Sequence, residues 1–285
     1  MMSVNNEKAG VLVEALPYIQ RFSGKKMVIK YGGAAMSNEA LKNSVMRDVA
    51  LLSIVGISVT LVHGGGPDIN DTLERLGKES VFVDGLRYTD EETMDVVAMV
   101  LGGKVNKSLV AHIHRSGGKA VGLCGVDGGM IKVRGLDFGN LGFVGDIMSI
   151  DATPINMALG EGFIPVIASI GVDNKGQFFN VNADTAAARI AAELKAEKLI
   201  LLSDVRGVLA DKKDEGSLLT NMHIDRIEAL EGQGIITGGM IPKIQSCKDA
   251  IEGGVHEAVI IDGRIEHSLL LELFSDSGIG TLFHA

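Results

Sequence analysis

Two apolar runs near the start of the chain end in glycine: Lys26-Met27-Val28-Ile29-Lys30-Tyr31-Gly32-Gly33 and Val59-Thr60-Leu61-Val62-His63-Gly64-Gly65-Gly66-Pro67. Each run is typical of a buried strand that leads into a turn at the carboxyl end of a sheet. Glycine lets an oxyanion approach the backbone N–H groups of such a turn closely. Since Lys30 stands beside the first turn, the two runs together predict a phosphate-binding site.

Short β-rich runs alternate with helical patterns along the rest of the chain, which predicts a parallel sheet with helices on both faces. We therefore expect an α/β fold, a three-layer αβα sandwich with an open, mostly parallel central sheet. The expected strands are 27–31, 58–62, 119–123, 164–167, 199–202 and 257–261. The expected helices are 38–55, 67–76, 90–116, 153–161, 183–195, 225–231 and 240–252.

Two segments depart from this alternation. Residues 130–150 are typical of a hairpin with arms at 130–133 and 143–147, and such an insertion is either a lid or an edge decoration. Residues 4–22 form an amphipathic helical pattern that Pro17 would kink. This helix has little core of its own to cover, so we expect it to pack on the body or on another subunit.

Composition excludes several classes of protein. The chain has 285 residues, 46% of them hydrophobic, and a net charge of -9, which argues against nucleic acid as the main partner. Its two cysteines make no disulfide framework, and no Cys/His set has metal-ligand spacing. No signal-peptide pattern and no uncharged run long enough to span a bilayer are present. We expect a soluble cytoplasmic protein with neither a membrane partner nor a metal site of its own.

The glycine turns differ from the common nucleotide loops. No segment matches G-x-x-x-x-G-K-[ST], and no G-x-G-x-x-G follows a strand, which disfavours a Walker-type loop and a dinucleotide-dependent oxidoreductase. The turn at 63–68 instead lies between a strand and a helix, whose first N–H groups are unpaired and suit an anion. A tight strand–helix turn is the alternative, and the neighbouring turn at 30–33 favours the functional interpretation.

Four further motifs carry polar groups that a core does not need. Gly85-Leu86-Arg87-Tyr88-Thr89 places an arginine, the planar partner of a carboxylate, just before a helix, although alone it would be a surface charge. Asn180-Val181-Asn182-Ala183-Asp184 has more short polar side chains than one helix cap requires, and Asp184 is suited to pair with lysines. Leu199 to Val208 is a buried strand with a polar turn. Gly234 to Lys243 is a third glycine-rich turn that leads into a helix.

These motifs, in this order, resemble the amino acid kinase family, most closely its members that phosphorylate N-acetyl-L-glutamate in arginine biosynthesis. The resemblance runs from about residue 25 to the C-terminus, and the motifs at 85–89 and 180–184 are its most specific combination. It implies ATP-dependent phosphorylation of the side-chain carboxylate, which gives N-acetyl-L-glutamyl 5-phosphate. It also implies a single domain, 1–285: an N-terminal helix (1–24), an acetylglutamate-binding and dimerisation lobe (25–178) and a nucleotide-binding lobe (179–285).

The resemblance implies a role for each motif. The acetylglutamate would bind Gly65, Gly66, Arg87 and Asn180, with its α-carboxylate on Arg87, under a lid formed by the hairpin at 130–150. Lys30 and Lys243 would flank the transferring phosphoryl group, oriented by Asp184. Gly32, Gly33 and Gly64 would cradle phosphate. ATP, with Mg²⁺ held mainly by its phosphates, would bind Asp204, Val205, Arg206, Gly207, Val208, Leu209, Ile235, Ile236 and Thr237.

The same resemblance implies regulation. Family members that L-arginine inhibits carry an extra N-terminal helix, which interlaces three dimers into a hexamer, and a C-terminal signature like residues 266–281 of this chain. Both features are present here. The implied arginine site consists of Tyr18, His267, Glu272 and Gly278. A regulatory signalling protein is a further possible partner of the hexamer.

Two alternatives stay open. The first is a kinase of the same family that acts on another carboxylate or carbamate, against which the combination of Arg87 and Asn180 argues. The second is a non-catalytic sensor that binds arginine and a partner protein. Such a sensor has no need of the charges on Lys30, Asp184 and Lys243.

Overall fold

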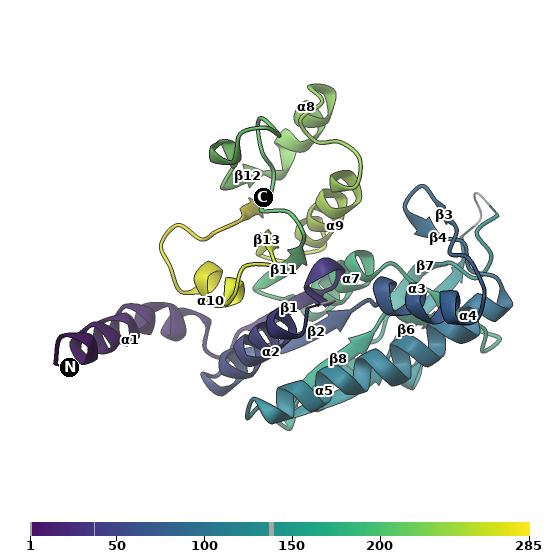
Figure 1. Cartoon of the computed structure of the whole chain (residues 1–285), viewed down its shortest axis with the longest axis horizontal. Helices are drawn as coiled ribbons and strands as arrows, with labels where there is room; N and C mark the ends of the chain where they lie inside the picture. The colour runs from purple at the N-terminus through teal and green to yellow at the C-terminus, as the bar shows by residue number, and fades with distance from the viewer. Residues whose placement is uncertain (1, 37, 137–139) are drawn as a thin grey trace.

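The computed structural model describes residues 2–36, 38–136 and 140–285. Within these residues, eight strands form the central sheet: β1 (Lys26–Tyr31), β2 (Ser58–His63), β5 (Ala120–Cys124), β8 (Ile164–Ala168), β11 (Lys198–Ser203), β12 (Asn221–His223), β13 (Glu257–Asp262) and β14 (Thr281–His284). Their order is β12-β14-β13-β11-β1-β2-β8-β5. Every neighbouring pair is parallel except β13–β14. The sheet is therefore mostly parallel and joins strands from both halves of the chain (Figure 1).

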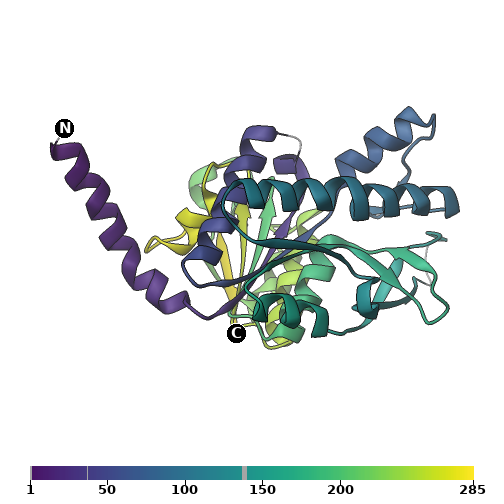
Figure 2. The ribbon, with the colours of Figure 1, turned by 90° about the horizontal axis from the view of Figure 1, so that it is seen from below.

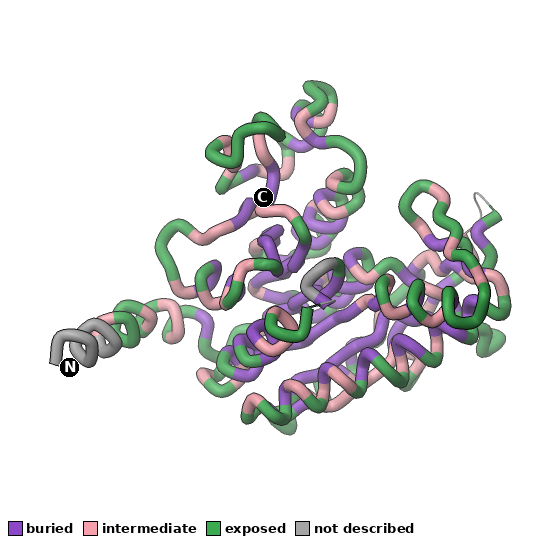
Figure 3. The backbone as a smooth tube through the Cα atoms, viewed as in Figure 1, coloured by how far each residue is buried: buried purple, intermediate pink, exposed green. Residues whose placement is uncertain are grey.

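Helices cover both faces of this sheet. One face packs on α2 (Glu39–Ile54), α3 (Gly66–Arg75), α10 (Ser268–Leu273) and a long continuous helix made of α4 (Glu91–Ala98), the π-helical segment η2 (Met99–Val105) and α5 (Asn106–Arg115). The other face packs on α6 (Thr153–Gly160), α7 (Ala183–Leu194), α8 (Ile227–Gly232) and α9 (Met240–Glu252). The predicted three-layer α/β fold is confirmed, and its buried strands lie between two more exposed helical layers (Figure 2, Figure 3).

The predicted elements of this framework are all present, with ends that differ by one or two residues. Short 3-10 turns connect some of them: η1 (Gly33–Met36), η3 (Asp127–Gly129), η4 (Glu215–Ser217) and η5 (Ile224–Arg226). The long helix Glu91–Arg115 has the length and apolarity of a membrane span. It packs on α2, β5 and β8, however, which is the position of a core helix.

The alternation of side chains along β1 decides which face receives Lys30. Met27, Ile29 and Tyr31 belong to the core under α2, whereas Val28 belongs to the core under α7 and α9. Because successive side chains of a strand point to opposite faces, Lys30 follows Val28 toward α7 and α9. Residues far along the chain can therefore contact it.

The pairing of β1 with β2 brings the two glycine turns together. Tyr31, the last residue of β1, lies opposite His63, the last residue of β2. On its other side β1 pairs with β11, so the turn that begins at Asp204 opens at the same edge of the sheet. In open α/β sheets this carboxyl edge is where ligands bind.

The predicted hairpin is confirmed as the antiparallel pair β6 (Ile131–Gly135) and β7 (Gly145–Ile150), with residues 137–139 of its turn outside the described residues. It is not an isolated insertion, because β9 (Ile170–Val172) and β10 (Phe178–Asn180) extend it to a four-stranded sheet. A second hairpin, β3 (Phe82–Val83) with β4 (Leu86–Arg87), was not predicted, since two-residue strands are too short to show a pattern.

The N-terminal helix α1 (Met2–Phe22) projects away from the body of the molecule (Figure 1, Figure 2). It continues through Pro17. Val11, Leu12, Val13 and Leu16 are between 49% and 73% exposed, whereas Phe22 at its end is buried. The middle of this helix, at 11–16, therefore presents apolar side chains to solvent.

Candidate active site

A pocket of about 260 Å³ lies at the carboxyl ends of β1 and β2. Gly32 and Gly33, from the turn after β1, line one part of its wall. Gly64, Gly65 and Gly66, from the turn after β2, line another. The glycine turns after β1 and β2 thus belong to one site, which we call the inner pocket.

A larger pocket of about 1,000 Å³ adjoins it and shares Gly33, Phe82 and Gly85 with it. We call this the outer pocket. Eight of the nine residues predicted to bind the nucleotide line it: Asp204, Val205, Arg206, Gly207, Val208, Leu209, Ile235 and Thr237. The side chain of the ninth, Ile236, is buried in the core and does not line this pocket. Two cations that were not predicted, Lys212 and Arg264, also line the wall.

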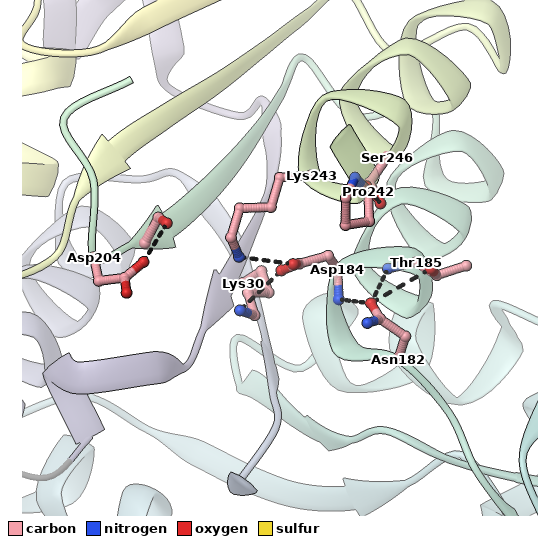
Figure 4. Close-up of polar contacts among 9 residues, drawn as sticks. Lys30, Asn182, Asp184, Thr185, Asp204, Pro242, Lys243 and Ser246 are labelled. Atoms are coloured by element: carbon pink, nitrogen blue, oxygen red, sulfur yellow. Dashed lines mark hydrogen bonds and ion pairs between the residues drawn. The ribbon is translucent and has the colours of Figure 1, made fainter. Parts of the chain in front are cut away.

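At the boundary between the two pockets, the carboxylate of Asp184 contacts two lysines, Lys30 and Lys243 (Figure 4). Lys30 Nζ lies 2.8 Å from Asp184 Oδ1, and Lys243 Nζ lies 3.0 Å from Asp184 Oδ2. Lys30 lines the inner pocket, and Lys243 lines the outer pocket. Residues from β1, α7 and α9 therefore meet at the boundary between the pockets.

Local structure explains why Asp184 is available for this contact. Asn182 caps α7, and its side-chain oxygen accepts hydrogen bonds from the N–H groups of Asp184 and Thr185. Capping is thus done by the neighbouring residue. Burial by itself would raise the pKa of Asp184, but the charges of Lys30 and Lys243 outweigh it and hold the pKa below its ordinary value. The carboxylate stays ionised and keeps both ammonium groups in place.

Glycine is required where Lys30 turns into the pocket. A Cβ atom on Gly32 would lie 2.8 Å from Lys30 Nζ. Gly33 has a φ of +69°, in the left-handed region that side chains disfavour. The first turn therefore leaves room for the ammonium group and reverses sharply beside it.

The second glycine turn packs against the π-helical segment η2. A Cβ atom on Gly65 would lie 2.6 Å from Leu101 Cδ2, so the backbone packs directly on that side chain. Gly66 is the first residue of α3, and a Cβ atom there would meet nothing within 4 Å. The first N–H groups of a helix lack intrahelical partners, so α3 offers hydrogen-bond donors at the pocket.

Arg87 is buried in the wall of the inner pocket and is not a surface charge. Its guanidinium donates to Ser80 Oγ at 2.6 Å, Asn70 Oδ1 at 2.7 Å and the carbonyl of Gly66 at 3.3 Å. It also lies over the ring of Phe82, 4.7 Å from its centre. Burial lowers the pKa of Arg87 from its usual value. This preorganised fork is suited to bind a carboxylate.

Two of these partners were not found from the sequence. Asn70 lies one helical turn after Gly66 in α3, a spacing that would have placed it above the glycine turn. Ser80 lies in an irregular segment and gives no such signal.

Asn180 reaches the same pocket from β10. Its amide Nδ2 donates to Thr89 Oγ1 at 3.3 Å. The hairpin at 130–150, predicted to be the lid, contributes Val144 to the wall among its described residues. The unpredicted β3–β4 hairpin contributes Phe82 and Gly85 to both pockets. Of the two hairpins, β3–β4 thus contributes described residues to both pockets, and the lid role of 130–150 stays a prediction.

A buried histidine supports the second glycine turn. His63 is fully buried, and Asn106 Nδ2 lies 3.1 Å from its Nε2. The same amide nitrogen donates to the carbonyls of Leu123 and Val166. The carbonyl of Gly64 lies 2.8 Å from Nδ1 and can only accept, so Nδ1 carries the proton and Nε2 faces the Asn106 amide as an acceptor. Burial lowers the pKa of His63 to about 4.

A third pocket, of about 580 Å³, lies between the end of α1 and the C-terminal segment. Three of the four residues implied for arginine binding line it: Tyr18, Glu272 and Gly278. Glu272 accepts a hydrogen bond from Ile279 N at 2.8 Å, and Tyr18 donates to Asp276. His267 does not line this pocket, because its ring contacts Asp48 on α2. Among the residues described with side chains, no group of three or more His, Cys, Asp or Glu is placed to hold a metal ion.

The chain is similar to known proteins over nearly its whole length. Residues 25–262 match the model of the amino acid kinase family. A protein of Heliobacterium modesticaldum named acetylglutamate kinase is 56% identical over an alignment that covers 97% of this chain and 97% of that protein.

Solved structures show the same fold. N-acetylglutamate synthase from Neisseria gonorrhoeae, complexed with coenzyme A and N-acetyl-glutamate, has a TM-score of 0.85 at 28% identity. The match covers 97% of this chain and 63% of that one. The synthase complexed with coenzyme A and L-arginine has a TM-score of 0.81 at 25% identity over 97% and 65% of the two chains. This chain thus spans less than two thirds of the synthase.

Proposed function

Because the chain belongs to the amino acid kinase family, we propose that it transfers the γ-phosphoryl group of ATP to the side-chain carboxylate of N-acetyl-L-glutamate. The product would be N-acetyl-L-glutamyl 5-phosphate, an intermediate of arginine biosynthesis. The high identity to an acetylglutamate kinase over nearly the whole chain supports this substrate. In this proposal residues 25–178 bind the acyl amino acid and form the dimer, and residues 179–285 bind the nucleotide.

The observation that carries the proposal is the pair of lysines on one buried carboxylate. Lys30 faces the inner pocket and Lys243 the outer one, and Asp184 neutralises only one of their two charges. One positive charge is left at the boundary between the pockets. A phosphoryl group that passes from one pocket to the other would cross this boundary.

The chemistry needs no general base, since the nucleophile is already a carboxylate. One of its oxygens would form a bond to the γ-phosphorus while the bond from that phosphorus to the bridging oxygen of ADP breaks. The barrier comes from bringing two anions together in line, so positioning and charge neutralisation dominate. Lys30, Lys243 and the N–H groups of the glycine turns would supply both.

The substrate would occupy the inner pocket, with its α-carboxylate on Arg87 and its amide beside Asn180. ATP would occupy the outer pocket, against 204–209 and 235–237. A divalent cation, Mg²⁺, would arrive with ATP and be held mainly by the nucleotide phosphates. It would neutralise phosphate charge that the lysines do not reach.

A side-by-side assay tests the proposal. ATP consumption by the purified chain is measured with N-acetyl-L-glutamate, L-glutamate, L-aspartate and carbamate at equal concentrations. We expect turnover with the acetylated substrate at least 100-fold above the others. Equal or higher turnover with an unacetylated substrate would establish the alternative kinase. Absence of turnover with all four would favour the non-catalytic sensor.

We propose further that L-arginine inhibits this reaction from the third pocket. Glu257, Glu272 and Asp276 line that pocket and suit a guanidinium group. The synthase that resembles this chain has been solved with L-arginine, which supports the idea. Millimolar arginine should lower wild-type turnover, Glu272→Gln should weaken that inhibition, and Glu161→Gln, at an exposed position just after α6, should not. Unchanged wild-type turnover would refute the proposal.

We propose also that α1 assembles three dimers into a hexamer. Apolar side chains at 11–16, with Leu12 at 73% exposed, are not buried against the rest of this chain, and packing against another subunit would bury them. Light scattering should give the mass of a hexamer, and Leu12→Glu should reduce it to that of a dimer. A wild-type mass no larger than a dimer would exclude this role. Residence in the cytoplasm and binding of a signalling protein stay predictions.

A further inference from the structure

Thr89 lies behind the inner pocket and links two residues proposed to bind the substrate. It is fully buried, two residues after Arg87. Its hydroxyl donates to the backbone carbonyl of Arg87 at 2.8 Å and accepts from Asn180 Nδ2 at 3.3 Å. A single oxygen thus connects the β4 segment to β10.

Backbone hydrogen bonds make the same connection through residues 141–143, which precede β7. Thr89 N donates to the carbonyl of Leu141 at 2.9 Å, and Phe143 N donates to the carbonyl of Thr89 at 2.6 Å. Asn180 N donates in turn to the carbonyl of Phe143 at 2.8 Å. The segment 141–143 therefore holds the backbones of Thr89 and Asn180 at a fixed separation.

Gly142 makes this close approach possible. Its φ is +69°, and a Cβ atom there would lie 2.2 Å from the carbonyl oxygen of Thr89. No larger residue fits without displacement of the backbone. The spacing between Thr89 and Asn180 is accordingly built into the fold and does not depend on a flexible side chain.

The direction of the Thr89 hydroxyl decides the orientation of the Asn180 amide. A hydroxyl has one proton, and here that proton is used on the carbonyl of Arg87. Toward Asn180 the oxygen can only accept, so Nδ2 must face Thr89. The rest of the amide is thereby presented to the inner pocket in one orientation out of two.

We propose that Thr89 is a positioning residue for the substrate amide site, which acts by fixing the Asn180 amide group. Thr89 does not line the inner pocket itself, and it acts through Asn180. The inference rests on the proposed function, in which Asn180 contacts the acylated amino acid. Loss of the hydroxyl frees the amide to rotate, so the affinity for that substrate falls while the nucleotide pocket is untouched.

Kinetics of the full chain test the proposal. Thr89→Val keeps the shape of the side chain and removes the hydroxyl, whereas Thr89→Ser keeps the hydroxyl. We expect Thr89→Val to raise the KM for N-acetyl-L-glutamate about tenfold, with the KM for ATP unchanged within about twofold. Thr89→Ser should stay within about threefold of wild type. A merely structural role would lower the active fraction, and hence kcat, with KM unchanged, and that result would overturn the proposal.

A double-mutant cycle asks whether the effect passes through Asn180. Thr89→Val is measured again in an Asn180→Ala background. We expect it to add less than about twofold to KM there, because its target is gone. Effects that multiply in the double variant would mean that Thr89 acts independently of Asn180, against the inference.

A spectroscopic readout separates this inference from the proposed function. The side-chain amide of Asn180 gives an NMR signal that is identified by its loss in Asn180→Ala. We expect Thr89→Val to move that signal toward the position of a free asparagine, and Thr89→Ser to leave it in place. An unmoved signal refutes the positioning role even if Thr89→Val folds poorly enough to weaken kinetics. Lack of turnover by wild type would refute only the proposed substrate.

Discussion

The Nζ atom of Lys30 lies 2.8 Å from Oδ1 of Asp184, and the two side chains are 9% and 10% exposed. Because both side chains are largely removed from water, the attraction between their charges is strong and salt screens it little. The second oxygen of the same carboxylate contacts Lys243, so a single acid fixes two cations. The site keeps a surplus positive charge without the flexibility that free lysines would have.

Replacing Lys30 tests this arrangement. Lys30→Ala should lower kcat about 10²- to 10³-fold, because one cation aimed at the developing phosphoryl charge is lost. The fold should persist, since Asp184 keeps Lys243 as its partner. Lys25→Ala is the matched control. That lysine precedes β1, pairs with Glu197 at the surface and is 51% exposed, so its loss should change kcat less than twofold. An unchanged rate in Lys30→Ala would refute the role given to it.

Arg87→Lys keeps the charge of the inner pocket and removes the planar fork. Arginine now makes separate bonds to Ser80, Asn70 and the carbonyl of Gly66, which an ammonium cannot reproduce together. We expect KM for N-acetyl-L-glutamate to rise about 10- to 100-fold, with KM for ATP unchanged. Arg75→Lys, on an exposed side chain at the end of α3, should leave both values as they are. Equal effects on both substrates would argue against a carboxylate on Arg87.

Two adjacent glycines should respond differently to alanine. Gly65→Ala pushes a methyl group against Leu101 and Val105, so we expect the free energy of unfolding to fall by about 1 to 3 kcal/mol. Gly66→Ala meets no protein atom, so stability should stay within about 0.5 kcal/mol while KM for the acyl amino acid rises. Urea unfolding and kinetics on the same preparations separate the two. Equal loss of stability in both variants would contradict the close packing of Gly65 on the π-helical segment.

Periodicity explains how much of this could be predicted from the sequence. The strands at 26–31 and 198–203 contain the apolar runs 27–29 and 199–202, so their places and their membership of one parallel sheet could be predicted from pattern. Lys30, Asp184 and Lys243 were named from motifs, and the family resemblance implied that Asp184 orients both lysines. The structure adds the two contacts themselves, at 2.8 Å and 3.0 Å.

Contacts between distant, short elements could not be predicted in this way. Phe82 lines both pockets from a two-residue strand, which is too short to show a period, so its place in the site could not be predicted. Asn106 supports His63 from a helix that shows only core patterning in the sequence. The family resemblance implied that His267 and Tyr18 belong to one arginine site, because His267 lies in the C-terminal signature. The turn before α10, with His267 at a φ of +58°, directs its ring to Asp48 instead.

That contact of His267 with Asp48 leads to a prediction about pH. Asp48 is fully buried, Oδ1 lies 2.6 Å from His267 Nδ1, and its other oxygen has no hydrogen-bond partner. Burial raises the pKa of Asp48 to about 6, although His267 opposes the shift. Between about pH 4 and 6 the native state therefore binds more protons at this site than the unfolded chain does. The ionisation of Asp48 therefore lowers the free energy of unfolding progressively as the pH rises through that window.

Asp48→Asn cannot ionise and removes this cost. The difference in free energy of unfolding between Asp48→Asn and wild type should shift in favour of the variant by about 2 to 3 kcal/mol from pH 4 to pH 7. Urea unfolding at several pH values measures it. The opposing contribution of His63, whose depressed pKa makes stability rise over much of the same range, is common to both proteins and cancels in the difference. His267→Gln removes a partner that lowers the pKa of Asp48, so it should move the window to higher pH. A difference that stays constant with pH would show that Asp48 titrates alike in the folded and unfolded chain.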